Sequence, residues 1–121
     1  MNPIQKVLRL TKYDYYETHL SIVNSFLPIK MTPMEIKVLS RFMALEGDIA
    51  IDRFGTSARK LVRESLGIST AGLSNYIGER GSLTEKKFIF QREGTDLIEI
   101  LPLLFPEKAE QGYMFKIINI G

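Results

Sequence analysis

Apolar residues recur at helical spacing near the start of the chain. From Tyr15 onward, positions three and four residues apart are apolar until Pro28, whose ring removes a backbone donor and stops a helix. We therefore expect a first helix between these two residues, preceded by a short strand or arm over residues 6–10. The apolar positions are Tyr16, Leu20, Ile22, Val23, Phe26 and Leu27.

The second predicted helix has the clearest start in the sequence. Thr32 can cap it, Pro33 suits its first position, and Glu35 can complete a capping box with Thr32. The apolar stripe that follows is wide, so most of this helix should lie in the core. The stripe consists of Ile36, Val38, Leu39, Phe42 and Met43.

A glycine-bounded segment and a third helix come next. Residues 47–55, GDIAIDRFG, alternate through Ile49 and Ile51, which predicts a short strand or an extended connector. Thr56 or Ser57 can cap the following helix. Its inward positions would be Leu61, Val62 and Leu66.

A fourth helix should follow after a sharp turn. Gly67 ends the preceding helix and Ser69 caps the next one. Gly72 and Gly78 each lower helix propensity by about 1 kcal/mol, so packing must hold this segment in place. Its inner face would carry Leu73, Tyr76 and Ile77.

The pattern changes to β after Gly81 and a pair of lysines. Residues 88–91, 96–101 and 113–120 are rich in β-branched and aromatic residues, and REGT at 92–95 has turn chemistry. Prolines frame residues 101–106, LPLLFP, as a rim or loop, and the polar residues 107–112 connect to the last strand. The sequence therefore predicts a single α+β domain over residues 1–121.

Composition excludes several classes of protein. The chain has 121 residues, 45% hydrophobic and 25% charged, with no apolar run that could span a membrane. The N-terminus lacks the features of a secretory signal, so we expect a cytoplasmic protein. With no cysteine and one histidine, neither a disulfide nor a metal site is expected, and no cofactor motif is present.

Charge is modest but unevenly distributed. The net charge is only +2. Residues 57–92 hold seven basic residues against three acids, a net of +4, which leaves −2 for the rest of the chain. This basic zone coincides with the predicted turn between the third and fourth helices, which favours a polyanionic partner there, with scattered charge on a solvated surface as the alternative.

Residues 61–77, LVRESLGISTAGLSNYI, resemble the helix-turn-helix of prokaryotic and phage DNA-binding proteins. Together with the basic linker and the predicted hairpin, residues 32–120 resemble the winged helix-turn-helix of phage and plasmid regulators and replication initiators. The resemblance implies an N-terminal arm and extra helix (1–30), a helical core with the helix-turn-helix (31–87) and a C-terminal β-hairpin or small antiparallel sheet as the wing (88–121). The positions that carry it are Val62, Leu66, Gly67, Ile68, Leu73 and Tyr76.

The resemblance also implies a site for double-stranded DNA. The second helix of the pair would enter the major groove, where the amide of Asn75 can pair with adenine. Two features depart from the family pattern: Arg63 occupies a position that is usually small, and the recognition helix has no basic residue before Arg80. The implied contact residues are Arg59, Lys60, Arg63, Ser69, Thr70, Ser74, Asn75, Arg80, Lys86, Lys87 and Arg92.

Other functions remain open at this stage. An enzyme is not expected, because no nucleophile with a base, carboxylate pair or metal cluster has a recognisable spacing, and His19 alone is more typical of a surface or partly buried side chain. The tyrosines at 13, 15 and 16 lie at the start of an amphipathic helix, where core or subunit packing is a simpler explanation than base stacking. Of these we favour a homodimer contact. The low net charge, the neutral recognition helix and LPLLFP instead favour a structural or adaptor protein, such as a phage virion, packaging or connector component.

Overall fold

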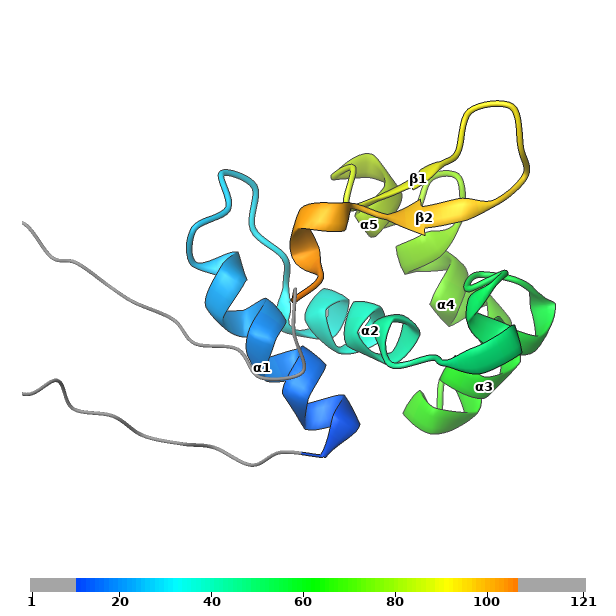
Figure 1. The fold of residues 1–121 in the computed structure, drawn as a ribbon, viewed down its shortest axis with the longest axis horizontal. Helices are drawn as coiled ribbons and strands as arrows, with labels where there is room; N and C mark the ends of the chain where they lie inside the picture. The colour runs from blue at the N-terminus through cyan, green and yellow to red at the C-terminus, as the bar shows by residue number, and fades with distance from the viewer. Residues whose placement is uncertain (1–10, 107–121) are drawn as a thin grey trace, which may run out of the picture.

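The computed structural model describes residues 11–106 and shows an α+β fold, as predicted (Figure 1). The predicted elements at residues 6–10 and 113–120 lie outside the described part. In chain order the elements are α1 (Lys12–Asn24), α2 (Pro33–Met43), the 3-10 helix η1 (Gly47–Ala50), α3 (Thr56–Leu66), α4 (Thr70–Ile77), α5 (Ser82–Glu85), β1 (Ile89–Gln91), β2 (Ile98–Ile100) and the 3-10 helix η2 (Pro102–Leu104).

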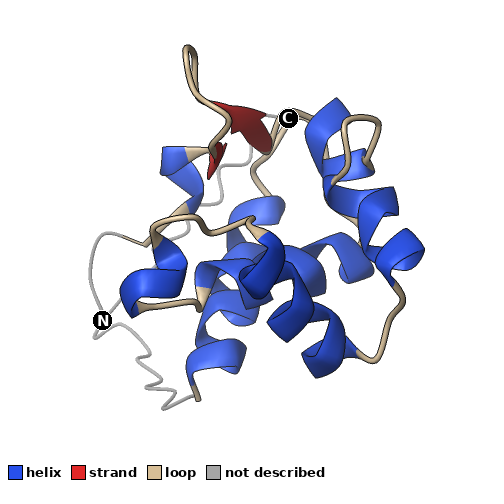
Figure 2. Cartoon of the chain, turned by 90° about the vertical axis from the view of Figure 1, so that its right-hand side faces the viewer, coloured by secondary structure: helices blue, strands red, loops and turns tan. Residues whose placement is uncertain are grey.

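Helix α2 lies at the centre and contacts α1, α3 and α4. Its predicted capping box is confirmed: the Glu35 N–H donates to Thr32 Oγ1 at 3.2 Å, and the Thr32 N–H donates to Glu35 Oε1 at 2.7 Å. The two strands lie at one end of the helical cluster (Figure 2). This arrangement places α2 under both the hairpin and the α3–α4 pair.

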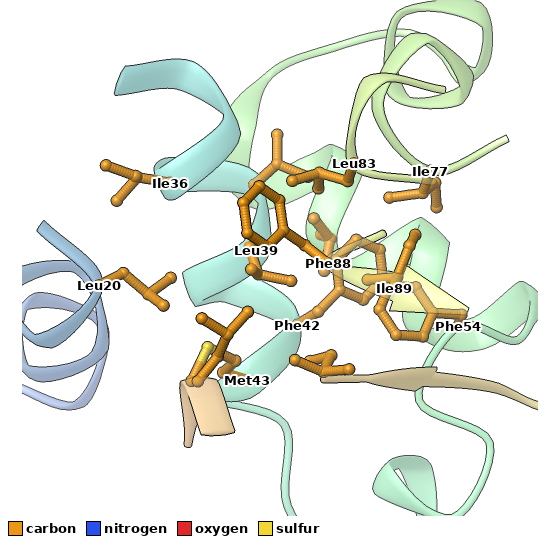
Figure 3. Packing of buried hydrophobic residues seen from close by; sticks show 14 of the residues in the cluster. Leu20, Ile36, Leu39, Phe42, Met43, Phe54, Ile77, Leu83, Phe88 and Ile89 are labelled. Carbon is orange, nitrogen blue, oxygen red and sulfur yellow. The ribbon is translucent and has the colours of Figure 1, made fainter. Parts of the chain in front are cut away.

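One continuous apolar core joins the helices to the hairpin (Figure 3). The side chain of Phe42 stacks on Phe54, with ring centroids 4.4 Å apart and an angle of 26° between the rings. Around this pair lie side chains from every layer, so the hairpin is packed on the helices and not an independent unit. They include Leu20, Leu39, Met43, Ile77, Leu83, Phe88 and Ile89.

The corner between α3 and α4 forms as the sequence predicts. Gly67 has φ +66°, the left-handed conformation that a glycine adopts without steric cost, and the Ile68 N–H donates to the Arg63 carbonyl at 3.1 Å. Ser69 then caps α4 by accepting the Gly72 N–H at 2.9 Å. The buried side chains of α4 are Leu73 and Ile77.

Helix α5 is absent from the sequence-based expectation, because four residues are too few to show a helical period. It ends at Glu85, and Lys87, the residue after the Lys86 cap, has φ +63° although it is not glycine. The N–H groups of Lys87 and Phe88 donate to Thr84 and Leu83, both at 3.0 Å, which is the bonding of a left-handed helix cap. Beyond it, β1 and β2 pair antiparallel, with Phe90 opposite Glu99.

The predicted strand or extended connector at residues 47–55 is wrong. Residues 47–50 form η1, beginning at Gly47 with φ +69°, and bends and turns follow. Two alternating isoleucines are too few to specify a strand, and no described strand pairs with this segment. Ile49 packs against the core, whereas Ile51 is 76% exposed.

The first helix is displaced from its predicted limits. It begins at Lys12, where Thr11 caps it, and ends at Asn24, before Pro28. The Asn24 side chain bonds both the N–H and the carbonyl of Met31, at 2.7 and 3.0 Å, and so holds the end of α1 against the start of α2. Phe26, predicted on the apolar stripe, therefore lies in the connection and is 66% exposed.

The predicted cap and inward positions of α3 need correction. The capping residue is Gly55, not Thr56 or Ser57, and no side-chain bond caps the helix. A Cβ at Gly55 would lie 2.4 Å from the Asp52 carboxylate. The buried row of α3 is Ala58 and Val62, four residues apart. Leu61 lies off this row and is 49% exposed, and Leu66 is only half-buried.

Candidate nucleic-acid interface

Helix α4 presents one uncovered polar face. Leu73 and Ile77 attach the helix to the core, and the predicted contact residues Ser69, Thr70, Ser74 and Asn75 are all exposed on its other side. Ser69 Oγ is used in the cap. The side chains of Thr70, Ser74 and Asn75 make no hydrogen bond to any residue between 11 and 106, so their donors and acceptors face solvent. The structure thus brings these four predicted residues together.

Helix α4 lies between α3 and α5 and contacts both (Figure 1). On and beside both neighbouring helices lie basic residues from the predicted contact set that form no ion pair with another described residue. Lys60 on α3 and Lys87 after α5 are exposed, and so is Arg80 after α4, while Arg63 is half-buried. None of these four side chains has a hydrogen bond or ion pair within residues 11–106. They are the cations of the basic zone whose side chains have no partner among the described residues.

Lys86 has a different environment. Its ammonium lies 2.6 Å from Glu35 Oε1 and donates to the Lys30 carbonyl at 2.9 Å. The Glu35 side chain is 1% exposed and that of Lys86 is 26% exposed. This pair joins the end of α5 to the start of α2, so the predicted phosphate contact at Lys86 competes with an internal partner.

The Glu35 carboxylate stays ionised because of that partner. Burial alone would raise the pKa of Glu35, but the bond from Lys86, the Thr32 N–H and the nearby Ser82 hydroxyl outweigh it and hold the pKa below its ordinary value of 4.5. Glu35 Oε2 and Ser82 Oγ are both buried and neither has a well-formed hydrogen bond within the described part of the chain. Glu35 is therefore a structural acid, used both in the α2 cap and in the ion pair.

Two further predicted contacts are also bonded within the chain. The Arg59 Nε donates to the Phe54 carbonyl at 2.6 Å, at the start of α3. Arg92 pairs with Glu99 across the hairpin, through Nε at 2.9 Å and through a second bond from its Nη2, and this raises the pKa of the exposed Arg92 guanidinium. Each of these guanidiniums has spare donors, but its position is set by an internal partner.

The hairpin turn is not cationic. From residue 92 to residue 96 it carries Arg92 against Glu93 and Asp96, a net of −1, and both acids are exposed. Within this turn, a contact to DNA phosphate could come only from Arg92. Glu93 and Asp96, which are negatively charged like the phosphate, would repel it. Positive charge instead lies beside α4, on α3 and after α5.

The sequence patterns did not predict the internal bonds of two polar side chains, the half-buried Arg53 and the buried His19. Arg53 Nη1 donates to three carbonyls at the end of α2, those of Phe42, Met43 and Leu45, at 2.8, 3.2 and 3.1 Å. His19, expected at or near the surface, is 5% exposed, and its Nε2 lies 2.9 Å from the Leu104 carbonyl, which fixes Nε2 as the donor. Neither contact has a recognised local pattern: Arg53 bonds carbonyls 8 to 11 positions before it, and His19 bonds a carbonyl 85 positions after it.

The tyrosine cluster near the start of α1 is partly used within the chain. Tyr13 is 45% exposed, and the guanidinium of Arg41 lies 4.2 Å from its ring centroid. The rings of Tyr15 and Tyr16 meet edge to face with centroids 5.3 Å apart. Tyr13 is the member that retains surface for a partner.

Among the described residues, no three histidine, aspartate or glutamate side chains cluster as metal ligands, and no helix is long and apolar enough to cross a membrane. The chain matches no protein-family model, and no curated protein or solved structure shows significant similarity to it. The chemistry of the site itself is therefore the basis for a functional proposal.

Proposed function

We propose that this protein binds double-stranded DNA, with α3 and α4 as a helix-turn-helix and β1–β2 as the hairpin of a winged-helix arrangement. The observation that carries the proposal is the exposed face of α4, where Thr70, Ser74 and Asn75 have no partner among the described residues. Two buried side chains hold the helix, so the fold itself does not require that polar face. A small transcriptional regulator or a replication-associated protein would use it.

The size of these side chains favours the major groove. The groove is about 12 Å wide and admits an α-helix. Small residues let the backbone of α4 approach the base edges, while Asn75 offers the donor and acceptor that read adenine. The hydroxyls of Thr70 and Ser74 can bond phosphate or either type of base, so they position the helix more than they specify sequence.

The charges predict moderate affinity. Around α4, the cations without internal partners are Lys60, Arg63, Arg80 and Lys87, and the acids on the same stretch are Glu64, Glu79 and Glu85. These groups give a net charge of +1, and Arg59, whose partner is a neutral carbonyl, raises it to +2. Binding should therefore depend on a few phosphate contacts, each of which steepens the dependence of log affinity on log salt by about 0.9.

The test is fluorescence anisotropy of a labelled mixed-sequence duplex titrated with the protein at low and moderate salt. We expect binding that weakens with salt, and we expect Lys60→Ala with Lys87→Ala to weaken it and to reduce the salt slope by about 2. The matched control is Lys12→Ala with Lys37→Ala, which removes the same charge from α1 and α2. Equal losses in the two double variants would show a non-specific charge effect and contradict the proposed site.

Asn75→Ala tests base reading after a preferred sequence is selected from random duplexes. We expect a loss of about 1 to 3 kcal/mol in discrimination at one base pair, with little change on unrelated sequences. Ser65→Ala, an exposed residue on α3, is the control for an ordinary surface change. If the preference is unchanged in Asn75→Ala, this residue reads no base.

Homodimerisation belongs to the same proposal. A single helix-turn-helix offers few base contacts, and a symmetric dimer doubles them. Tyr13 on α1 is the exposed aromatic that we assign to such a contact. Sedimentation of the wild-type chain and of Tyr13→Ser over a range of concentrations tests this, and a monomer at all concentrations would exclude the dimer.

The acidic hairpin turn favours a second candidate, a structural or adaptor protein that uses the same fold to bind protein. Glu93 and Asp96 repel a phosphate backbone, and Leu61 and Leu103 expose apolar surface at 49% and 62%. This function would leave the duplex unbound even at low salt. The anisotropy titration therefore separates the two candidates.

A further inference from the structure

An open cleft of about 370 Å³ runs beside strand β2. One wall comes from the segment after α2, with Ala50, Ile51 and Arg53, and Pro102 and Phe105 line it as well. The other wall includes four consecutive residues, 97–100. Successive strand residues point to opposite faces of a sheet, so a cleft that touches all four follows the edge of the strand. Its volume would hold about a dozen water molecules.

Among residues 11–106, nothing pairs with the backbone of β2 on this edge. Bonds from the Arg92 N–H to Leu97 at 2.8 Å and from the Leu101 N–H to Phe88 at 2.9 Å mark two hydrogen-bonded pairs of the hairpin. Antiparallel pairing alternates, so Ile98 and Ile100 direct their N–H and carbonyl groups away from β1. No residue from 11 to 106 outside the hairpin bonds them. Natural sheets usually cover such an edge.

The chain itself supplies a segment that fits. Phe105 lines the cleft, so the sequence after Pro106 starts beside it. The polar residues 107–112 can span up to about 20 Å, which is enough to reverse direction. Residues 113–120, YMFKIINI, then have the composition of a buried strand with a single charge. Strands that follow one another in sequence usually pair as neighbours.

We propose that residues 113–120 dock in this cleft and pair antiparallel with the free edge of β2. The sheet would then have the order β1, β2 and the C-terminal segment, with β2 in the middle. Isolated two-stranded hairpins are marginally stable, and a third strand with an apolar face removes that weakness. The added strand would also cover Ile51, which is 76% exposed. This inference does not depend on DNA binding.

Amide hydrogen exchange on the full-length ¹⁵N-labelled chain tests the pairing. We expect the Ile98 and Ile100 amides to exchange at least about tenfold more slowly in the wild type than in Ile117→Pro, which breaks a strand. Ala109→Pro is the matched control, because it introduces the same residue into the connector and should retain the protection. Short-range Hα and amide contacts between residues 97–101 and 113–120 in the wild type give a second measurement that needs no variant.

The outcomes separate the possible occupants of the cleft. Protection with intrachain contacts at every concentration supports the proposal. Rapid exchange of both isoleucine amides in the folded wild type, or protection that survives in Ile117→Pro, overturns it. Protection that appears only as concentration rises, with contacts between differently labelled copies, assigns the edge to a second copy and also overturns the proposal.

Discussion

Helices α2 and α4 are both short, but they differ in how much of their surface is buried. Seven of the eleven residues of α2 are buried, including the polar Glu35 and Ser40, whereas only two of the eight residues of α4 are buried. Neighbours on several sides therefore constrain most positions of α2. The outer face of α4 has no such constraint, so packing does not explain its run of Thr, Ser and Asn. This difference is the reason we propose α4, and not α2, as the helix that contacts a partner.

The adjacent residues Lys86 and Lys87 reproduce this contrast on a smaller scale. The ammonium of Lys86 is bonded to the buried Glu35, while Lys87 is exposed and has no bonded partner within the described range. Equal charges on neighbouring positions should therefore have separate roles. Lys86 should support the fold and Lys87 should support binding.

The largest expected effect follows from Lys86→Met. Removing the ammonium leaves the Glu35 carboxylate buried without its charged partner, and we expect the free energy of unfolding to fall by about 3 kcal/mol. Lys87→Met removes the same charge from an exposed side chain and should change stability by less than about 0.5 kcal/mol. Urea titration of both variants measures the difference. Similar stabilities for the two variants would show that the ion pair contributes little to the free energy of unfolding. The separate roles assigned to Lys86 and Lys87 would then be wrong.

A smaller effect is expected at His19, which connects α1 to η2. His19→Leu leaves the buried Leu104 carbonyl without its donor and should lower the free energy of unfolding by about 2 kcal/mol near pH 7.5. His19→Gln, whose amide can also donate, should lose less. Urea titrations at fixed temperature give both values.

The same residue predicts a pH dependence. Burial lowers the pKa of His19 below its ordinary value of 6.5, and the bond to Leu104 offsets this only in part. The unfolded chain therefore binds the proton more readily, so this contribution to stability is complete above pH 6.5 and is lost as the pH falls below it. Glu35 acts in the same direction but only below pH 4.5. Stability measured from pH 7.5 to 5 should fall in the wild type and stay nearly level in His19→Gln; parallel curves would contradict this assignment.

Sequence patterns predicted those features that local chemistry determines. The capping box at Thr32 and Glu35 and the glycine turn at Gly67 are set by neighbouring residues, and both formed as expected. The exposed face of α4 followed from its period for the same reason. Patterns failed where a distant partner decides: Lys86 looked like a surface cation, but its partner Glu35 is 51 positions away. Leu61 looked like a core residue, and only packing against α2 shows that the row through Val62 is the buried one.

The smallest expected effect concerns the backbone at Lys87, where φ is +63°. A lysine in this conformation is strained by about 1 to 2 kcal/mol, and glycine is not, although glycine loses more entropy on folding. We expect Lys87→Gly to raise the free energy of unfolding by about 0.5 to 1 kcal/mol and, at the same time, to weaken DNA binding by one phosphate contact. Gly67→Ala is the reverse control, because it introduces a Cβ at a glycine with nearly the same φ, +66°. It should lower the free energy of unfolding by about 1 kcal/mol. If the Lys87→Gly variant is more stable than the wild type, the presence of lysine at this position would be explained by a contribution of its charge to DNA binding. If Lys87→Gly is more stable and binds DNA as well as the wild type, that explanation fails and Lys87 does not belong to the interface.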